Sequence, residues 1–506
     1  MHLAQTRYAQ RMCAEMWIKM LFNSTFFLLV FLPIALIGWY LLQNLKTPVP
    51  ARIFLVGMSL WFYGYYNPSY LLVLVGSLFV NYLCSALLKA EKPGRLRFFT
   101  ALGGQLFNVG LLFYFKYFNF FLDNCNFFFH TNWQVERIAL PLGISFFTFQ
   151  QISFLVERYR DRAPHYRFID YACFITFFPQ LIAGPIVLHS EFLPQLLSGK
   201  NRKPDANRFF DGMALFILGL AKKVLLADTL AIVVNAEYGN IAYLDLPSAW
   251  VVIICYMLEL YFDFSGYCDM ARGIGKLFGF ELPENFHAPL KADSVRDFWH
   301  RWHITLSRFL TQYIYIPLGG NRKGKARKCL NLLIVFAVSG LWHGANWTFV
   351  VWGLLHGIAM VWETLFPKLR FRWNWCNRLV TGVYVTLTFS VFRSDSLTSA
   401  WVLIKKLFAG GFHGFFAGMC NTLQIQETYL IRKALELKFP AALNPFYMLC
   451  MAALLIIAAL LIKGKMAEEW IAQKGQTKGG ILVLATLFTW AFVSLSQVST
   501  FLYFNF

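Results

Sequence analysis

One histidine lies inside a long stretch of sequence that carries no charge. Residues 329–362 contain no Asp, Glu, Lys or Arg, and Trp342, His343 and Asn346 fall near their middle. As a single helix this stretch would measure about 51 Å, whereas the hydrocarbon core of a bilayer is roughly 30 Å thick. We therefore expect the helix to break within residues 340–346. Irregular backbone at membrane depth persists only inside protein or beside a cavity, so His343 is a candidate functional group.

The chemistry that suits such a histidine is general-base catalysis. Burial keeps an imidazole neutral, and a neutral imidazole can take a proton from an attacking hydroxyl group. Trp342 and Trp347 are candidate walls of the site, and Asn346 is a candidate for orienting the ring or a substrate. The alternative is a structural histidine bonded to a carbonyl of the broken helix. The residues alone leave these two interpretations equally open.

A second group of reactive side chains lies at residues 298–307, where aromatic, basic and imidazole groups alternate. Trp302 and Arg301 belong to it, and helical spacing predicts His300 and His303 on one face, three residues apart. A zinc site needs further ligands, and no third ligand is evident, so we predict no metal. Anchoring by aromatic residues at the membrane interface is the alternative interpretation.

An acidic residue occurs among aromatic residues at 261–267, directly after an apolar segment. Asp263 is this acid, and Ser265 follows it. A carboxylate at a membrane boundary needs a partner, and Arg272, Arg301 or an imidazole could provide one. A structural ion pair and a role in orienting a catalytic group both remain open.

The composition identifies the kind of chain that must position these groups. Of the 506 residues, 58% are hydrophobic and only 14% are charged, against about 25% charged in soluble proteins. This excludes a soluble enzyme and a disordered chain, and it predicts a protein that crosses a membrane many times. The formal net charge of +20 then indicates basic cytoplasmic loops rather than nucleic-acid binding.

The apolar segments predict an all-α polytopic fold with about 11–13 membrane helices, several of them broken or re-entrant. Continuous apolar runs are unlike the alternating strands of a membrane barrel. Segments at 138–156 and 168–187 contain Pro and Gly and are expected to be interrupted. The clear candidates are residues 25–43, 52–66, 69–88, 98–120, 209–233, 248–264, 330–342, 347–362, 377–392, 444–462 and 480–504.

Loop charges predict the orientation and the start of the protein. The loops at 44–52 and 89–97 are basic, which places them in the cytoplasm and the start of the first span outside. Basic residues in 1–19 would then lie on the outer face, so we expect Met20 to be the biological start. Residues 1–19 are then an extension or, alternatively, an interfacial helix. Residues 20–506 are expected to form a single membrane domain.

Taken together, these motifs resemble the membrane-bound O-acyltransferase (MBOAT) family. Within it, the chain is similar to the branch of the alginate O-acetyltransferase membrane subunit and the D-alanyl transferase of teichoic acid synthesis. The resemblance covers roughly residues 140–360. The matching stretches are residues 141–150, 177–185, 261–267, 283–286, 298–307, 315–322 and 339–347.

The resemblance implies a ring of helices around a central tunnel, with catalytic histidines at His343 and His303. It implies no bound cofactor. It further implies transfer of an acetyl group from cytosolic acetyl-CoA to an extracytoplasmic polysaccharide, such as alginate, or to a periplasmic partner protein, at the bacterial inner membrane. His300 and the pair His287–Ala288 depart from the family pattern, which bears on the substrate. The candidate substrate and tunnel residues are Asp263, Ser265, Arg301, Trp302, Trp342 and Asn346.

Two alternatives remain. One is D-alanyl transfer from a carrier protein to an envelope polymer. The other is a secondary transporter or flippase, for which paired repeats with matching broken helices are typical. The break near His343 has no counterpart elsewhere in the sequence, which disfavours the transporter. Direct transfer and transfer through an acyl-enzyme intermediate are not distinguished by the sequence.

Overall fold

The computed structural model describes residues 20–88, 94–134, 138–199, 202–497 and 501–502. The regular elements in these residues are helices, apart from an isolated antiparallel bridge between Phe286 and Trp302. The expectations for residues 1–19 concern a segment outside the described residues. Contacts divide the chain into two compact units, and each unit is built from separate stretches of the chain. The expectation of one membrane domain over residues 20–506 stays a prediction.

The first unit comprises Met1–Leu220, Tyr267–Pro283 and Lys474–Thr500. Its core includes buried amides that bond one another across three helices. Asn81 and Asn108 exchange two amide hydrogen bonds of 2.6 and 3.1 Å, and Asn81 also donates to Gln151 Oε1 at 2.8 Å. Amides within apolar helices must find such partners, because lipid offers none.

The elements of the first unit run in chain order from η1 to α11 and end with α24 and η10. They are η1 (Phe27–Phe31), α2 (Leu32–Gln43), α3 (Val49–Tyr66), α4 (Pro68–Leu87), α5 (Arg95–Leu112), η2 (Phe113–Tyr117), α6 (Phe118–Phe129), α7 (Ile144–Tyr159), α8 (Phe168–Thr176), α9 (Phe178–Leu181), α10 (His189–Leu197), α11 (Ala206–Ala221), α24 (Lys478–Val493) and η10 (Ser494–Gln497).

The second unit comprises Ala221–Gly266, Glu284–Gln473 and Phe501–Phe506, and it holds all the candidate site residues. Helix α13 (Leu246–Leu277) contributes its first part, up to Gly266. The other elements are η3 (Lys222–Ala227), α12 (Asp228–Tyr238), η4 (Ile241–Tyr243), η5 (Pro289–Lys291), α14 (Val295–Arg301), α15 (Ile304–Leu310), η6 (Thr311–Tyr315), α16 (Gly324–His343), α17 (Trp347–Leu365), α18 (Asn374–Arg393), α19 (Leu397–Ala409), α20 (Phe415–Cys420), η7 (Gln426–Thr428), α21 (Tyr429–Lys438), η8 (Pro440–Ala442), α22 (Leu443–Lys463), α23 (Ala467–Trp470) and η9 (Ile471–Gly475).

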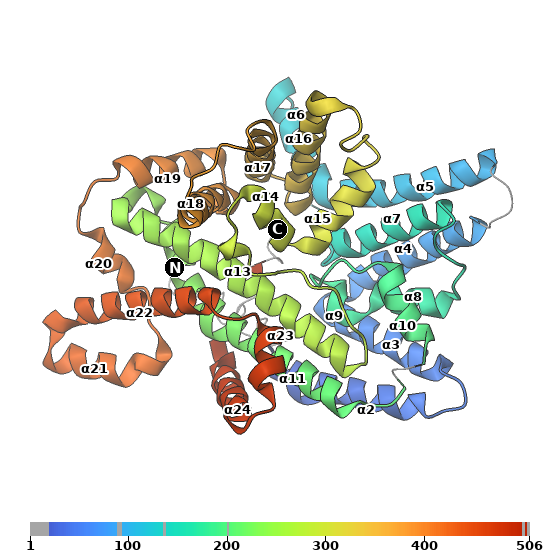
Figure 1. The fold of residues 1–506 in the computed structure, drawn as a ribbon, viewed down its shortest axis with the longest axis horizontal. Coiled ribbons are helices and arrows are strands. Elements are labelled where there is room, and N and C mark those ends of the chain that lie inside the picture. The colour runs from blue at the N-terminus through green and yellow to red at the C-terminus, as the bar shows by residue number, and fades with distance from the viewer. Residues whose placement is uncertain (1–19, 89–93, 135–137, 200–201, 498–500, 503–506) are drawn as a thin grey trace. The chain divides into compact units, whose positions relative to one another are not determined.

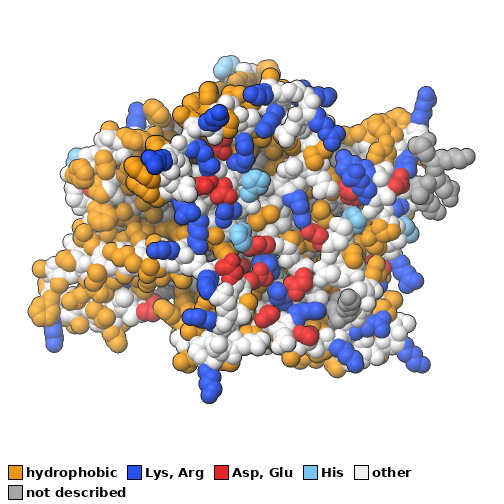
Figure 2. Space-filling view, viewed as in Figure 1, with side chains coloured by type: hydrophobic (Ala, Val, Ile, Leu, Met, Phe, Trp, Pro, Cys, Tyr) orange, Lys and Arg blue, Asp and Glu red, His pale blue; other side chains and the backbone are white. Residues whose placement is uncertain are grey.

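Several helices have the length and composition of membrane spans, which confirms an all-α polytopic membrane protein. Every apolar segment expected from the sequence contains a helix, and the number of 11–13 spans stays a prediction. Exposed hydrophobic side chains cover much of the face over α21 and α22 (Figure 2). Five described helices are long and apolar enough to cross a membrane: Pro68–Leu87, Arg95–Phe129, Leu246–Leu277, Trp347–Leu365 and Pro440–Lys463.

The two segments with internal Pro and Gly are interrupted, as expected. Between α8 and α9 the helix breaks at Phe177, just before Pro179. Residues 138–143 are not helical, and α7 begins only after Gly143, whose φ of +72° suits glycine. These breaks lie in the first unit.

Helices α16 and α17 form the most extensive helix–helix contact among the described elements, and Figure 1 shows them side by side. Glycines allow their backbones to approach closely. A Cβ atom added to Gly340 would lie 2.3 Å from the carbonyl oxygen of Phe349, and one added to Gly353 would lie 2.2 Å from that of Phe336. This contact holds the end of α16, with His343, against the start of α17.

We expect Gly353→Ala to lower the stability of the protein by about 1–3 kcal/mol, because the new methyl group would overlap a backbone carbonyl. The measurement is the midpoint of thermal unfolding in detergent. The control is Gly382→Ala on α18, where a Cβ would meet no atom within 4 Å, so this variant should match or exceed the wild type. Equal midpoints for the two variants would contradict the packing argument.

Candidate active site

The helix break expected near His343 is present. Helix α16 ends at His343, residues 344–346 are not helical, and α17 begins at Trp347. The side chain of Asn346 caps α17, because its Oδ1 accepts from the backbone N–H of Thr348 at 3.1 Å. Its Nδ2 donates to the carbonyl of Asp395 at 3.0 Å. Asn346 therefore fixes the break itself, and its suggested contact with a substrate stays a prediction.

The His343 ring is held by its own helix. Its Nδ1 lies 2.7 Å from the carbonyl oxygen of Ser339. A carbonyl can only accept, so Nδ1 carries the hydrogen and the lone pair of the neutral ring is at Nε2. This is the bond that the structural interpretation of His343 required, yet it leaves Nε2 in the form that a general base needs. Both interpretations therefore remain compatible with the geometry.

Aromatic rings surround the His343 imidazole, which is 5% exposed. Trp342 and Trp352 meet it edge to face at centroid distances of 5.0 and 4.9 Å, and Phe392 lies at 5.4 Å. Trp347, expected as a wall, is instead 46% exposed. The tryptophan of α17 that packs against His343 is Trp352, five residues further along the helix.

His303 does not share a helical face with His300, contrary to the expectation from their spacing. Helix α14 ends at Arg301, Trp302 is extended, and His303 adopts a left-handed conformation with φ of +46°. The chain therefore turns between the two histidines. His303 is fully buried, whereas His300 is exposed.

The side chain of Asn285, in the segment before α14, contacts the His303 ring. Asn285 Oδ1 lies 3.2 Å from His303 Nδ1, and it also accepts from the hydroxyl of Thr305 at 2.9 Å. The ring of Phe264, from α13, packs edge to face on His303 at 4.9 Å. Elements distant in sequence thus converge on one imidazole.

The two candidate imidazoles lie close together. The ring centroids of His303 and His343 are 6.3 Å apart, and the Trp342 ring contacts both. Burial lowers the pKa of His303 well below its usual value, and the nearby His343 lowers it further. A neutral His303 ring is therefore the expected form at neutral pH. The structure brings together the two histidines that the resemblance selected.

Asp263 has a different partner from those expected. Its Oδ1 lies 2.5 Å from Lys223 Nζ, and the same ammonium group lies 2.8 Å from Asp228 Oδ1. The other oxygen of Asp263 accepts from the backbone N–H of Leu502 at 3.0 Å. Arg301 instead bonds Asp297 at 2.8 Å. These contacts favour a structural ion pair for Asp263, because its carboxylate is already engaged on both oxygens.

Two further candidates are buried beside the site. Trp302 is 2% exposed, and its ring stacks on Phe298 and meets Phe286 edge to face. Ser265 is also 2% exposed, and its hydroxyl has no hydrogen-bond partner within the described residues. Trp302 therefore packs the site, whereas the role of Ser265 in binding substrate stays a prediction.

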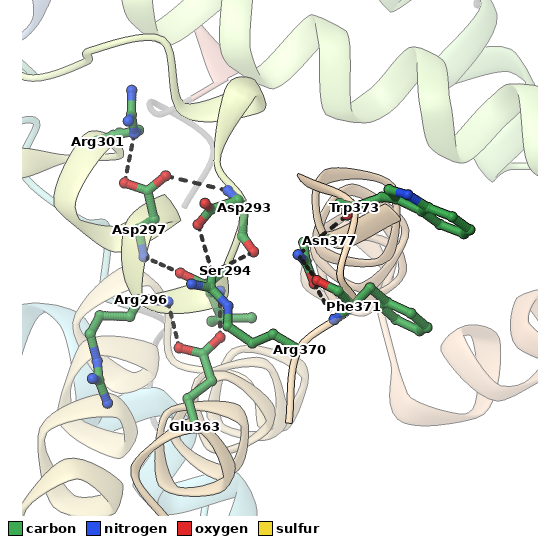
Figure 3. A network of polar contacts seen from close by, with 11 residues as sticks. Asp293, Ser294, Arg296, Asp297, Arg301, Glu363, Arg370, Phe371, Trp373 and Asn377 are labelled. Atoms are coloured by element: carbon green, nitrogen blue, oxygen red, sulfur yellow. Dashed lines mark hydrogen bonds and ion pairs between the residues drawn. The ribbon is translucent and has the colours of Figure 1, made fainter. Parts of the chain in front are cut away.

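The start of α14 is anchored to α17 (Figure 3). The two carboxylate oxygens of Glu363 accept from the backbone N–H groups of Val295 and Arg296, at 2.7 and 3.1 Å. Arg370 donates to the carbonyl of Asp293 at 2.9 Å and to its carboxylate at 2.7 Å. Glu363 thus accepts from backbone N–H groups that have no partner within α14, and its negative charge is favourable at the N-terminus of that helix. This anchors the helix that leads to His303.

Sequence reasoning missed Asn285, Trp352 and His356. His356 is fully bonded, because its Nδ1 accepts from Trp299 Nε1 at 3.2 Å and its Nε2 lies 3.0 Å from the hydroxyl oxygen of Thr388. Trp352, Gly353 and His356 share the inward face of α17, and their spacing was a readable signal. Asn285 lies in a matching motif, but only the fold shows what its amide contacts.

The residue types at this site suit acid–base chemistry. Within the described residues, no group of three or more His, Cys, Asp or Glu side chains could hold a metal ion. Two adjacent imidazoles, in their neutral forms, can accept a proton and hydrogen bonds from reacting groups.

Comparison with known proteins finds some relatives that match nearly the whole chain and others that match part of it. The chain is 36% identical to a peptidoglycan O-acetyltransferase of Helicobacter pylori, over 96% of this chain and 98% of that protein. It is 35% identical to a probable alginate O-acetylase of Pseudomonas aeruginosa, over 78% of this chain and 75% of that protein. It is 26% identical to a teichoic acid D-alanyltransferase of Bacillus subtilis, over 49% of this chain and 65% of that protein.

A family model for membrane-bound O-acyltransferases matches residues 111–393. The matched region includes His303 and His343, the helix break and the segment around Asn285. With the match along nearly the full length of the Helicobacter relative, these findings establish that the chain belongs to the MBOAT family.

Proposed function

We propose that this protein transfers an acetyl group from cytosolic acetyl-CoA to a hydroxyl group of a cell-envelope polysaccharide, at the bacterial inner membrane. Peptidoglycan is the favoured acceptor, because the peptidoglycan O-acetyltransferase relative matches 96% of the chain and the alginate O-acetylase relatives match 78%. The family resemblance in the sequence pointed to an exopolysaccharide such as alginate, which is the second candidate acceptor. The family match favours a transferase over a transporter.

The observation that carries this proposal is the pair of buried imidazoles, 6.3 Å apart. In the reaction, Nε2 of His343 takes the proton of the acceptor hydroxyl as its oxygen attacks the thioester carbonyl. A C–O bond forms and the C–S bond breaks. The thiolate of CoA then receives the proton from the His343 imidazolium, so the reaction yields an ester and free thiol with no net proton release.

His303 is proposed to position the reacting groups. With its hydrogen on Nδ1, the neutral ring offers a lone pair at Nε2 and no N–H group there. The single proton of the attacking hydroxyl goes to His343, so Nε2 of His303 can accept a hydrogen bond from a second donor group of the acceptor, such as a neighbouring sugar hydroxyl. Polarising the thioester carbonyl, by contrast, would need a protonated ring. Burial opposes that charge. The structure therefore supports the positioning role over the polarising role.

Two features of the proposal extend beyond the site. A periplasmic partner protein could carry the acetyl group between this protein and the polymer, and transfer could be direct or through an acyl-enzyme intermediate. D-alanyl transfer is less well supported, because the D-alanyltransferase relative matches only about half of the chain.

We expect His343→Ala to reduce acetyl transfer by about 10²- to 10⁴-fold, the usual contribution of a positioned general base. The measurement is incorporation of label from radioactive acetyl-CoA into polymer by membranes from cells that synthesise it. Membrane insertion and the unfolding midpoint show whether the variant folds. Equal incorporation by a folded variant and the wild type would refute the assignment of His343.

We expect His303→Ala to reduce transfer on the order of 10²-fold as well, because the acceptor would lose the hydrogen-bond partner that positions it beside His343. His300→Ala is the matched control, since His300 is exposed and only three residues away. It should retain wild-type transfer. Similar activities for the two variants would indicate that burial of His303 serves packing rather than chemistry.

The acceptor can be identified in a strain that lacks its own O-acetyltransferases. We expect the wild-type protein to raise the ester-linked acetate of purified peptidoglycan, and His343→Ala not to do so, as measured by acetate release with mild base. Acetate that appears only in an exopolysaccharide fraction would favour the second acceptor. Acetate in neither fraction, with inserted protein and its partner genes present, would contradict a polysaccharide acceptor.

A further inference from the structure

Asn285 is a buried residue, 1% exposed, with no role assigned so far beyond contact with His303. Its Oδ1 atom faces three groups of the segment that follows α14. These are the backbone N–H of Thr305 at 3.2 Å, the hydroxyl of Thr305 at 2.9 Å, and Nδ1 of His303 at 3.2 Å. One amide oxygen therefore lies where a histidine and the first turn of α15 meet.

The orientation of this amide follows from its neighbours. The oxygen and nitrogen of an Asn side chain are told apart by the groups they contact. A backbone N–H can only donate, so the Asn285 atom facing Thr305 N must be the oxygen. The same oxygen faces His303 Nδ1, so Nδ1 must carry a hydrogen. Asn285 thereby determines which nitrogen of His303 is protonated.

The backbone around Asn285 fixes this contact on both sides. The carbonyl of Asn285 accepts from the N–H of Ile304 at 3.0 Å, and the N–H of His287 donates to the carbonyl of Arg301 at 2.9 Å. The two segments thus run antiparallel around the bridge at Phe286. His303 sits at a φ of +46°, a conformation that costs free energy for a residue with a side chain. The paired segments hold it there.

We propose that Asn285 is a positioning residue that acts through His303. Its amide oxygen holds the imidazole with the hydrogen at Nδ1, so that Nε2 faces the reaction as a hydrogen-bond acceptor. This inference rests on the proposed function, in which His303 accepts a hydrogen bond from the acceptor and so positions it beside His343. An amide suits this task because it orients the ring without favouring its charged form, as a carboxylate would.

The charges around His303 stay the same when only residue 285 changes. His343 faces the ring from α16. On α13, Asp263 is adjacent to Phe264 and is paired with Lys223, and on α14 Arg301 is paired with Asp297. A carboxylate introduced at position 285 would be the new charge next to the ring. It would favour the imidazolium form and raise the pH at which His303 becomes neutral.

The test compares Asn285→Asp and Asn285→Leu with the wild type, using label transfer from acetyl-CoA across a range of pH. For Asn285→Asp we expect the acidic limb of kcat/KM to move up by about 1–3 pH units, with activity recovering at alkaline pH. For Asn285→Leu we expect kcat to fall on the order of 10- to 100-fold with a smaller change in KM. Both follow from loss or change of the partner at Nδ1.

Asn377→Asp is the matched control. Its amide also bonds backbone, accepting from the N–H of Phe371 and donating to its carbonyl, both at 3.0 Å. Figure 3 shows these bonds apart from those that anchor α14 to α17. Its acidic limb should coincide with that of the wild type. An unshifted limb in folded Asn285→Asp would overturn the inference, even if Asn285→Leu fails to fold. Wild-type transfer by His303→Ala would instead refute the proposed role of His303 itself.

Discussion

The site depends on one constraint, which is that the chain must turn back immediately after His343. A helix that continued through α16 and α17 would be far longer than a bilayer is thick. The chain turns at residues 344–346, and the two helices then pack so closely that backbone carbonyls lie where side chains at Gly340 and Gly353 would be. This places Trp352 against the His343 ring. The break and the glycine contact therefore create the aromatic enclosure together.

Inside this enclosure, neutral groups rather than charges control the two imidazoles. His343 is bonded to a helix carbonyl and His303 to an amide oxygen, so the neutral form of each ring has its lone pair at Nε2. The carboxylate of Asp263, the residue before Phe264 on α13, is paired with Lys223. Carboxylate partners would favour imidazolium, which cannot accept a proton. The arrangement suits an O-acyltransferase whose bases must stay neutral in a buried site.

Much of this could be predicted from the sequence, and the misses have physical causes. The absence of charge over residues 329–362 predicted the break near His343, because one uninterrupted helix of that length would exceed the thickness of a bilayer. The pairing of Asp263 was wrong, because Lys223 is 40 residues away and pairing depends on which helices pack together. The shared face of His300 and His303 was wrong because α14 ends at Arg301, and helical spacing holds only within a helix.

By itself, the sequence determined that the chain is a helical membrane protein and where its apolar segments lie, and its family resemblance singled out two histidines as candidates. These properties follow from local composition and from motifs, which are read residue by residue. Only the tertiary structure decided that His303 and His343 lie together, that Trp352 rather than Trp347 encloses the site, and that Asn285 sets the protonated nitrogen of His303. Such facts depend on contacts between segments distant in sequence, and those contacts exist only once the helices have packed.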